Sequence, residues 1–325
     1  YNGDKMNNLI GNTPMIKIKY KYNDNINYIY VKLEQYNLTG SIKDRLALYI
    51  IKHATENGVL KENMPIVEAT SGNTGISFAA LGVKYNHPVY IFMPNWASKE
   101  RVNLMKLYGA KVILVSKEEG GFKKCIELAD KLALEINGFR PDQFSNTLNI
   151  KCHFETTGTE IIKQLPNINL GGFVSGIGTG GTLVGISRKL REYYPNMINC
   201  AVEPKQMPLL TNGKIKESHK IEGIGDDFIP ELVNTDEIDC VFDIDDNDAI
   251  NMSRLLGQKL GLGVGISSGA NFLGSVLLQD KIKKPLVTVF PDDNKKYLST
   301  DLINEIDNNS NFLSNKIELL EYSLI

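Results

Sequence analysis

Short apolar runs alternate with longer amphipathic segments along most of this chain, and that alternation most constrains its fold. The short runs are rich in valine and isoleucine, which indicates buried strands, and the longer segments indicate helices. The expected strands are residues 28–32, 65–69, 89–93, 111–115, 172–175, 199–203 and 285–290. The expected helices are residues 43–57, 74–84, 98–108, 121–136, 183–193 and 248–260. Strict alternation predicts an α/β fold with mostly parallel sheets that helices cover on both faces.

Chain length and a break in the alternation both indicate two domains. The chain has 325 residues, which is typical of about two domains. The polar stretch 140–149 divides the alternating elements into two sets, so we expect two doubly wound α/β domains. The tail from residue 308 is polar and then mildly amphipathic, and we expect it to be peripheral.

Composition argues against several other classes of protein. The 36 basic and 38 acidic side chains nearly balance, which argues against binding to nucleic acid through a basic surface. No stretch approaches the roughly 20 apolar residues that cross a bilayer, and the first residues lack an apolar signal core. We therefore expect a cytoplasmic protein without a membrane partner. The four cysteines and four histidines are scattered, so we expect reduced thiols and no metal site.

One loop after an expected strand has the composition of a phosphate site. The segment from Gly176 to Thr182 contains four glycines and two threonines and precedes a helix. Glycines let backbone N–H groups converge on an anion, and the helix dipole adds to the attraction. Gly176, Gly178 and Gly181 also match the dinucleotide pattern G-x-G-x-x-G, and Glu203 follows at the expected interval. On this loop alone, a nicotinamide enzyme is a fair interpretation.

Three further loops precede helices at the same kind of position, where open parallel sheets bind ligands. Residues 70–75 offer three hydroxyls, one amide and a helix N-terminus, which suits a carboxylate. Lys43 lies in the first turn of a helix, where the dipole disfavours a cation, and a lowered pKa suits a Schiff-base amine. Residues 264–270 are small and polar, and alone they are equally typical of a packing turn.

Together these loops resemble the cysteine synthase and cystathionine β-synthase family. The matching segments follow one another at residues 8–14, 32–34, 41–45, 71–75, 143–146, 153–158, 176–182, 223–225 and 297–300. The resemblance implies a pyridoxal 5'-phosphate (PLP) enzyme of the tryptophan-synthase-β-like architecture (fold type II), active as a homodimer on a small amino acid. It favours this interpretation over a nicotinamide oxidoreductase. It also disfavours a non-catalytic binding module, because the family's functional residues are present.

The resemblance also implies a domain division and roles for individual residues. A smaller domain at residues 34–150 would move on substrate binding, and residues 1–33 with 151–325 would form the larger, cofactor-binding domain. Lys43 would form the imine with the cofactor and move protons at Cα, Asn73 would bind the phenolic oxygen, and Ser267 would face the pyridine nitrogen. The cofactor phosphate would be held by Gly178, Thr179, Gly180, Gly181 and Thr182. The substrate would be bound by Thr70, Ser71, Gly72, Thr74, Gln143 and Gly223.

The implied reaction is β-elimination or β-replacement on cysteine or O-acetylserine through an α-aminoacrylate. Simple cysteine synthases commonly carry Ala-Gly after Gly-Ile-Gly, whereas this chain carries Asp226 and Asp227. A carboxylate there would repel hydrosulfide and could serve as a general base toward water or a thiol. We therefore predict that Asp226 is catalytic and that L-cysteine is consumed with release of hydrogen sulfide, water giving L-serine or a thiol giving a thioether.

Several alternatives stay open at this point. The enzyme could instead make cysteine from O-acetylserine and sulfide, or act like a cystathionine β-synthase. The two aspartates could be a solvated surface pair beside a proline. Residues 292–296 replace a common turn of the family, and we expect them to be surface variation.

Overall fold

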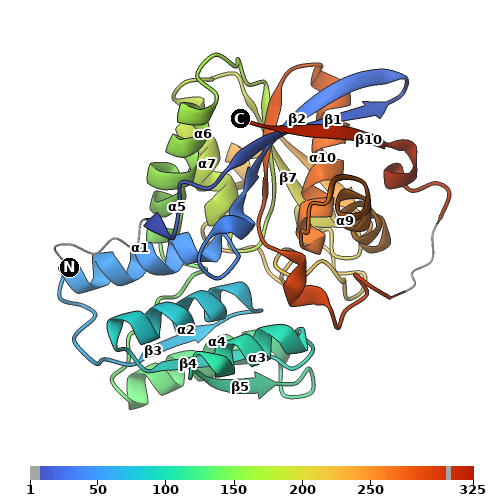
Figure 1. Ribbon diagram of the computed structural model, residues 1–325. Coiled ribbons are helices and arrows are strands. Elements are labelled where there is room, and N and C mark those ends of the chain that lie inside the picture. The colour runs from blue at the N-terminus through green and yellow to red at the C-terminus, as the bar shows by residue number, and fades with distance from the viewer. Residues whose placement is uncertain (1–7, 305–308) are drawn as a thin grey trace.

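The computed structural model describes residues 8–304 and 309–325, and its strands form two sheets (Figure 1). The larger sheet has the order β10-β1-β2-β9-β6-β7-β8 and the smaller one the order β3-β4-β5. The larger sheet contains β1 (Met15–Tyr22), β2 (Asn25–Leu33), β6 (Gly172–Gly176), β7 (Ile198–Pro204), β8 (Cys240–Ile244), β9 (Leu286–Phe290) and β10 (Glu318–Leu324). The smaller sheet contains β3 (Ile66–Ala69), β4 (Val89–Pro94) and β5 (Lys111–Val115). All pairings are parallel except β1 with β2 and β1 with β10.

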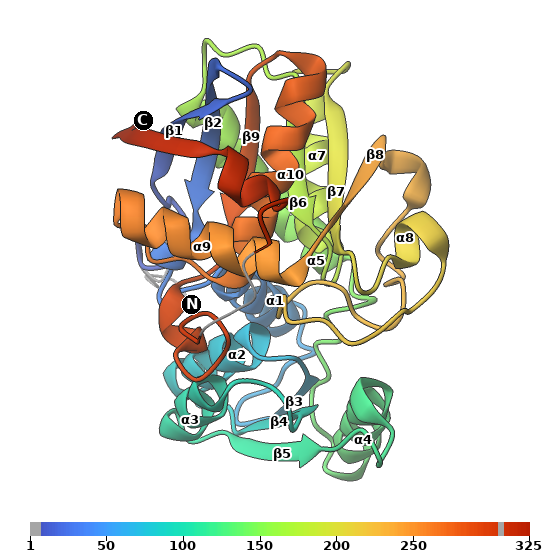
Figure 2. The same ribbon diagram turned by 90° about the vertical axis from the view of Figure 1, so that its right-hand side faces the viewer.

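Helices cover both faces of both sheets, so the predicted doubly wound α/β class is confirmed. The helices are α1 (Lys43–Glu56), α2 (Asn73–Tyr85), α3 (Lys99–Leu107), α4 (Gly121–Glu135), α5 (Leu148–His153), α6 (Thr159–Gln164), α7 (Gly181–Arg191), α8 (Leu209–Asn212), α9 (Asp246–Leu260) and α10 (Ile266–Ile282). Helices α9 and α10 pack on one face of the larger sheet, toward the viewer in Figure 2, and α6 and α7 pack on the other. In the smaller sheet, α1 and α2 pack on one face and α4 on the other.

Side-chain alternation along the strands explains the two cores of each sheet. Neighbouring residues of a strand point to opposite faces. Ile66 and Val67 of β3 accordingly belong to different hydrophobic clusters, as do Phe173 and Val174 of β6. Because both faces of these strands are buried, their sequences are continuous apolar runs rather than alternating ones.

Three strands of the larger sheet were not predicted. Strand β1 alternates isoleucine with lysine, a half-buried pattern, and it joins β2 through a turn in which Asn23 and Asp24 both have positive φ. Strand β8 is short and only partly buried. The tail is peripheral, as expected, but its residues 318–324 form an unpredicted strand, β10, at the sheet edge with mostly exposed side chains. These strands lie at or near the sheet edges, where apolar runs are short and give weak signals.

The carboxyl ends of β3, β6 and β9 meet between the two sheets, and the loops that follow them line one cavity. Helix α1 begins at the same place, and its apolar face packs into the core of the smaller sheet. The fold therefore brings together loops that are far apart along the sequence. Within the described residues, no helix has both the length and the apolar character needed to cross a membrane.

Candidate active site

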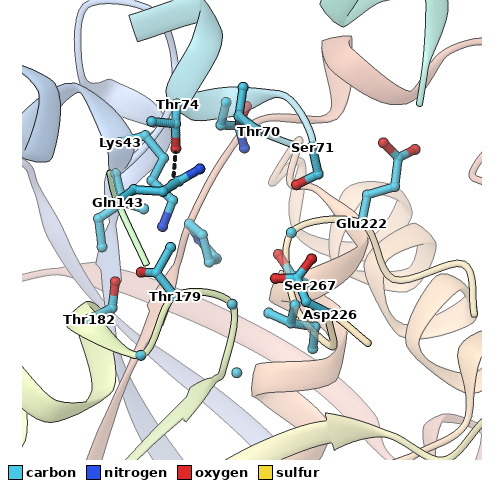
Figure 3. A pocket seen from close by; sticks show the side chains of 18 of the residues that line it. Lys43, Thr70, Ser71, Thr74, Gln143, Thr179, Thr182, Glu222, Asp226 and Ser267 are labelled. Atoms are coloured by element: carbon cyan, nitrogen blue, oxygen red, sulfur yellow. Dashed lines mark hydrogen bonds between the residues drawn. The ribbon is translucent and has the colours of Figure 1, made fainter. Parts of the chain in front are cut away.

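The cavity between the sheets collects the predicted site residues (Figure 3). All of them except Gly72 and Gly181 line its wall: Lys43, Thr70, Ser71, Asn73, Thr74, Gln143, Gly178, Thr179, Gly180, Thr182, Gly223, Asp226 and Ser267. The two exceptions make room for neighbouring side chains. A Cβ at Gly72 would overlap the side chain of Arg101, and one at Gly181 would overlap that of Asn149.

The glycine loop connects β6 to α7 and forms a cradle with the chemistry of an anion site. Gly180 has a φ of +86°, a conformation that glycine adopts without strain, and α7 begins at the next residue. The backbone N–H groups at this helix start and the hydroxyls of Thr179 and Thr182 are the donors available to an anion. A Cβ at Gly178 would overlap the carbonyl oxygen of Gly223, so the loop packs closely against the segment that follows α8.

Two buried residues that the sequence analysis missed hold the threonines of this loop. The Asn149 side-chain amide donates to Thr179 Oγ1 at 2.8 Å. The His153 ring lies 3.3 Å from Thr182 Oγ1 and 3.0 Å from Thr157 Oγ1. Burial, with the nearby positive charges of Lys43 and Arg45, holds the pKa of His153 well below its usual range. The ring is therefore neutral and can orient hydroxyls without adding charge. His153 is the first residue of the segment 153–158, which resembles the family, so the sequence did offer a signal for this residue.

Lys43 lies in the first turn of α1 and reaches into the cavity. Burial lowers its pKa, while the carboxylates of Asp226 and Asp292 act in the opposite direction. The helix dipole alone predicts a lowered pKa of Lys43, but burial is the main cause in the structure. A lowered pKa leaves more of the amine neutral, which is the form that attacks a carbonyl carbon.

A preorganised polar cluster lies at the start of α2. The Thr74 hydroxyl donates to Gln143 Oε1 at 2.6 Å, and Gln143 Nε2 donates to the carbonyl oxygen of Ala69 at 2.9 Å (Figure 3). Thr70 Oγ1 accepts the backbone N–H of Gly72 at 3.0 Å. These bonds fix the side chains around a helix N-terminus, an arrangement that suits the carboxylate of a small molecule.

Asp226 faces Lys43 across the cavity (Figure 3). Burial raises the pKa of the Asp226 carboxyl to about 6, the charge of Asp227 adds to the rise, and Lys43 opposes it. Asp226 is therefore not a solvated surface residue, although its neighbour Asp227 does not line this cavity. A carboxylate with a pKa near 6 can accept and release a proton close to neutral pH.

The expectation that residues 292–296 are surface variation is wrong for Asp292 and Lys296. Asp292 is 0% exposed and Lys296 2% exposed. The Asp292 carboxylate accepts hydrogen bonds from Asn73 and Tyr297, and Lys296 Nζ donates to the carbonyl oxygen of Gly40 at 2.7 Å. A charged run usually indicates a solvated turn, but here distant groups satisfy the charges in the interior.

Arg101 and Glu222 also line the cavity, and neither was predicted from the sequence. The fully buried Arg101 guanidinium forms an ion pair with Glu222 and lies 3.6 Å from the carboxylate of Asp292. It thereby connects α3 beside the smaller sheet with two loops of the larger one. No local sequence pattern marks such a residue.

Glu203, the acidic residue of the dinucleotide-like pattern, is engaged elsewhere. Its carboxylate accepts the backbone N–H groups of Leu210 and Thr211 at 2.8 and 3.0 Å. It is not part of the wall of the cavity. The carboxylate that the dinucleotide pattern requires for binding a ribose is therefore already occupied, which disfavours a nicotinamide cofactor. Among the described residues there is also no group of three or more metal-ligating side chains.

The fold and the site define a class, α/β enzymes in which a half-buried lysine of lowered pKa shares a cavity with a glycine loop suited to an anion at a helix N-terminus. The family described as "Pyridoxal-phosphate dependent enzyme" matches residues 6–292, and the chain belongs to this family. Its cofactor is therefore pyridoxal 5'-phosphate. The composition and backbone of the glycine loop fit the cofactor phosphate. Asn73 Oδ1 is buried at the cavity wall and has no hydrogen-bond partner among the described residues, so it can accept a hydrogen bond from a ligand.

Similar proteins narrow the class. A cysteine synthase of Staphylococcus aureus is 38% identical over 301 residues, which cover 92% of this chain and 96% of the relative. The crystal structure of a hydrogen sulfide-producing enzyme from Fusobacterium nucleatum is 49% identical with a TM-score of 0.95, covering 98% of this chain and 97% of that one. An aspartate-to-asparagine mutant of that enzyme, solved with an α-aminoacrylate intermediate, is 50% identical with the same coverage and TM-score. The chain is thus a cysteine synthase-like enzyme of sulfur amino acid metabolism, as the resemblance implied.

Replacing Gly178 with alanine is expected to weaken cofactor binding by about tenfold or more, because the methyl group would displace the carbonyl of Gly223 and distort the cradle. Titration of the apoprotein with PLP, followed by absorbance, measures the dissociation constant. Gly257→Ala is the matched control, since a Cβ there has only an ordinary contact at 3.8 Å. Equal affinity in both variants would contradict the steric role of Gly178.

Proposed function

We propose that this enzyme converts L-cysteine and water into L-serine and hydrogen sulfide, with Asp226 as the general base toward water. One observation carries the proposal: a half-buried carboxylate faces the lysine amine across the cavity, and its pKa of about 6 suits proton transfer. The choice of L-cysteine as substrate and water as nucleophile rests on this carboxylate, because the rest of the cavity wall suits any β-substituted alanine.

Other residues of the cavity bind the cofactor and the substrate and move the Cα proton. PLP, when bound, acidifies the Cα–H bond and lets the β-substituent leave. Lys43 takes the Cα proton and returns it after addition at Cβ. Asn73 and Ser267 hold the cofactor ring, and the glycine loop holds its phosphate through Gly178, Thr179, Gly180, Gly181 and Thr182. The substrate is held by Thr70, Ser71, Gly72, Thr74, Gln143 and Gly223.

Asp226 acts on the second half of the reaction. Its carboxylate accepts a proton from water as the oxygen adds to Cβ, which replaces the C–S bond by a C–O bond. The wall carries two acidic side chains, Asp226 and Glu222, and two basic ones, Lys43 and Arg101, and Arg101 pairs with Glu222. The ionised carboxylate of Asp226 locally disfavours return of the hydrosulfide anion and so favours its release.

The Fusobacterium nucleatum protein supports this direction, because it is a hydrogen sulfide-producing enzyme. Its aspartate-to-asparagine mutant was solved with an intermediate bound, which supports a carboxylate at the step that consumes the intermediate.

Two alternatives have support from other relatives. The S. aureus relative is a cysteine synthase, and an O-acetylserine dependent cystathionine β-synthase from Helicobacter pylori is 35% identical, with a TM-score of 0.85 and coverage of 92% of this chain and 98% of that one.

Product analysis with L-cysteine as the sole substrate tests the proposal. Sulfide and L-serine are expected in equal amounts, with little pyruvate and little thioether. A thioether in place of serine would show that a second cysteine, not water, is the nucleophile. Absence of sulfide release from the PLP-loaded enzyme would overturn the proposal.

Serine formation is expected to decline as the pH falls through about 6, because protonated Asp226 cannot accept a proton from water. The folded-state pKa is raised, so the active carboxylate form exists above this value and is lost below it. The dependence of kcat on pH, measured between about pH 5 and about pH 9, checks the expectation. A flat profile through pH 6 would contradict the assignment.

The domain movement and the assembly implied by the resemblance are part of the same proposal. Residues 34–150 contribute Thr70 to Thr74 and Gln143, whereas residues 151–325 contribute the glycine loop and Asp226. Movement of the smaller unit would bring the carboxylate-binding cluster toward the substrate and exclude water other than the reacting molecule. We propose that the enzyme does this as a cytoplasmic homodimer.

A further inference from the structure

The segment that follows β9 contacts the segments that carry Lys43, Asn73 and Ser267. The backbone N–H of Ile42, next to Lys43, donates to the carbonyl oxygen of Pro291 at 2.8 Å. The backbone N–H of Gly265, two residues before Ser267, donates to the carbonyl oxygen of Asp292 at 3.0 Å. Ser41 and Asp292 form an isolated antiparallel bridge. This short segment therefore sets the relative positions of Lys43, proposed to form the imine, and Ser267, proposed to face the cofactor ring.

The side chain of Asp292 extends the connection to Asn73. Asp292 Oδ2 accepts Asn73 Nδ2 and the Tyr297 hydroxyl, each at 2.7 Å, and the Arg101 guanidinium lies 3.6 Å away. Asn73 reaches the cavity wall, and its own Oδ1 has no hydrogen-bond partner among the described residues. The Asn73 amide is thus held on one side by Asp292, while the rest of its hydrogen-bonding capacity is left for a ligand.

The geometry points to Asp292 as a positioning residue, which orients Asn73 toward the cofactor and holds its segment against those of Lys43 and Ser267. This inference rests on the cofactor-facing role of Asn73 in the proposed function. Asp292 itself does not line the cavity and touches no reacting atom.

Three donors converge on one oxygen of Asp292. Asn73 Nδ2, the Tyr297 hydroxyl and the Arg101 guanidinium all face Oδ2, whereas Oδ1 is buried without a hydrogen-bond partner among the described residues. An asparagine could keep its single oxygen in the same place, so it is a poor test of this contact. An alanine removes the shared acceptor and releases Asn73 from its orientation.

Asp292→Ala tests the inference, with Asp293→Ala as the matched control. Asp293 is the next residue, and its Oδ1 caps the backbone N–H of Lys295 rather than contacting Asn73. We expect the PLP dissociation constant of the Asp292 variant to rise about tenfold or more and its visible absorption band to shift, with parent values in the control. A dissociation constant and a band equal to the parent's would overturn the inference.

A double-mutant cycle separates orientation of Asn73 from a general loss of stability. If Asp292 acts through Asn73, adding Asp292→Ala to Asn73→Ala has little further effect on PLP affinity, whereas independent, additive effects would contradict the inference. Tyr297→Phe is a milder variant in case Asp292→Ala does not fold. Tyr297→Phe should weaken PLP binding by a smaller factor, and only when Asn73 is present. If it weakened PLP binding equally in the Asn73→Ala background, the inference would be contradicted. These readouts need no substrate, so failure of the cysteine reaction would not be mistaken for failure of this inference.

Discussion

Lys43→Ala is expected to abolish the visible absorption band of the lysine–cofactor imine, at about 400–430 nm, and to lower sulfide release from L-cysteine by about 10³-fold or more. In the proposed function, Lys43 is both the amine that binds the cofactor covalently and the base that moves the Cα proton, so the variant would lose both. Within the described residues, no other lysine lines the cavity, so none is placed to take over. Absorption spectra and a sulfide assay on the same preparation measure both effects.

Lys151→Ala provides the control for Lys43→Ala. Lys151 belongs to α5, and its side chain is half exposed and pairs with Glu155. This variant should match the parent in spectrum and rate, because surface ion pairs of this kind contribute little. An imine band that survives in Lys43→Ala, or an equal loss in both variants, would contradict the assignment of Lys43.

Asp226→Asn is expected to lower serine formation from L-cysteine by about 10²–10³-fold, the range that general-base assistance supplies. The amide keeps the size of the side chain but cannot accept a proton from water. The absorption band of the imine should persist, because Lys43 is unchanged. The decline in kcat below pH 6 should disappear, since the titrating carboxyl is gone.

Asp227→Asn is the matched variant for Asp226. Asp227 does not line the cavity, but its charge is one of the causes that raise the pKa of Asp226. Its removal should leave the rate at about pH 8 within about threefold of the parent and move the low-pH decline to lower pH. A large loss in Asp227→Asn with none in Asp226→Asn would reverse the two roles.

The α/β class and most of the cavity wall were predictable from sequence because their signals are local. Buried parallel strands are short apolar runs, and ligand loops follow their carboxyl ends. The glycine loop and the segment at 70–75 are each contiguous, so composition alone indicated anion binding. Strand β10 was missed because its exposed edge position leaves no apolar run to detect.

The network around Asp292 could not be predicted because its partners are distant along the chain. Asn73 precedes Asp292 by 219 residues, and Arg101 is separated from Glu222 by 121. Whether a charged residue is buried depends on such partners, so the run at 292–296 resembles a solvated turn. The sequence did identify Asp226 as unusual, but only the fold places its carboxylate opposite Lys43.

The most direct test compares kcat/KM for L-cysteine alone with kcat/KM for O-acetylserine in the presence of sulfide, on the same PLP-loaded enzyme. The proposal predicts the larger value for L-cysteine, with sulfide and serine formed in equal amounts and that activity lost in Asp226→Asn. A much larger value for O-acetylserine with sulfide, undiminished in Asp226→Asn, would contradict the proposal and establish cysteine synthesis as the reaction.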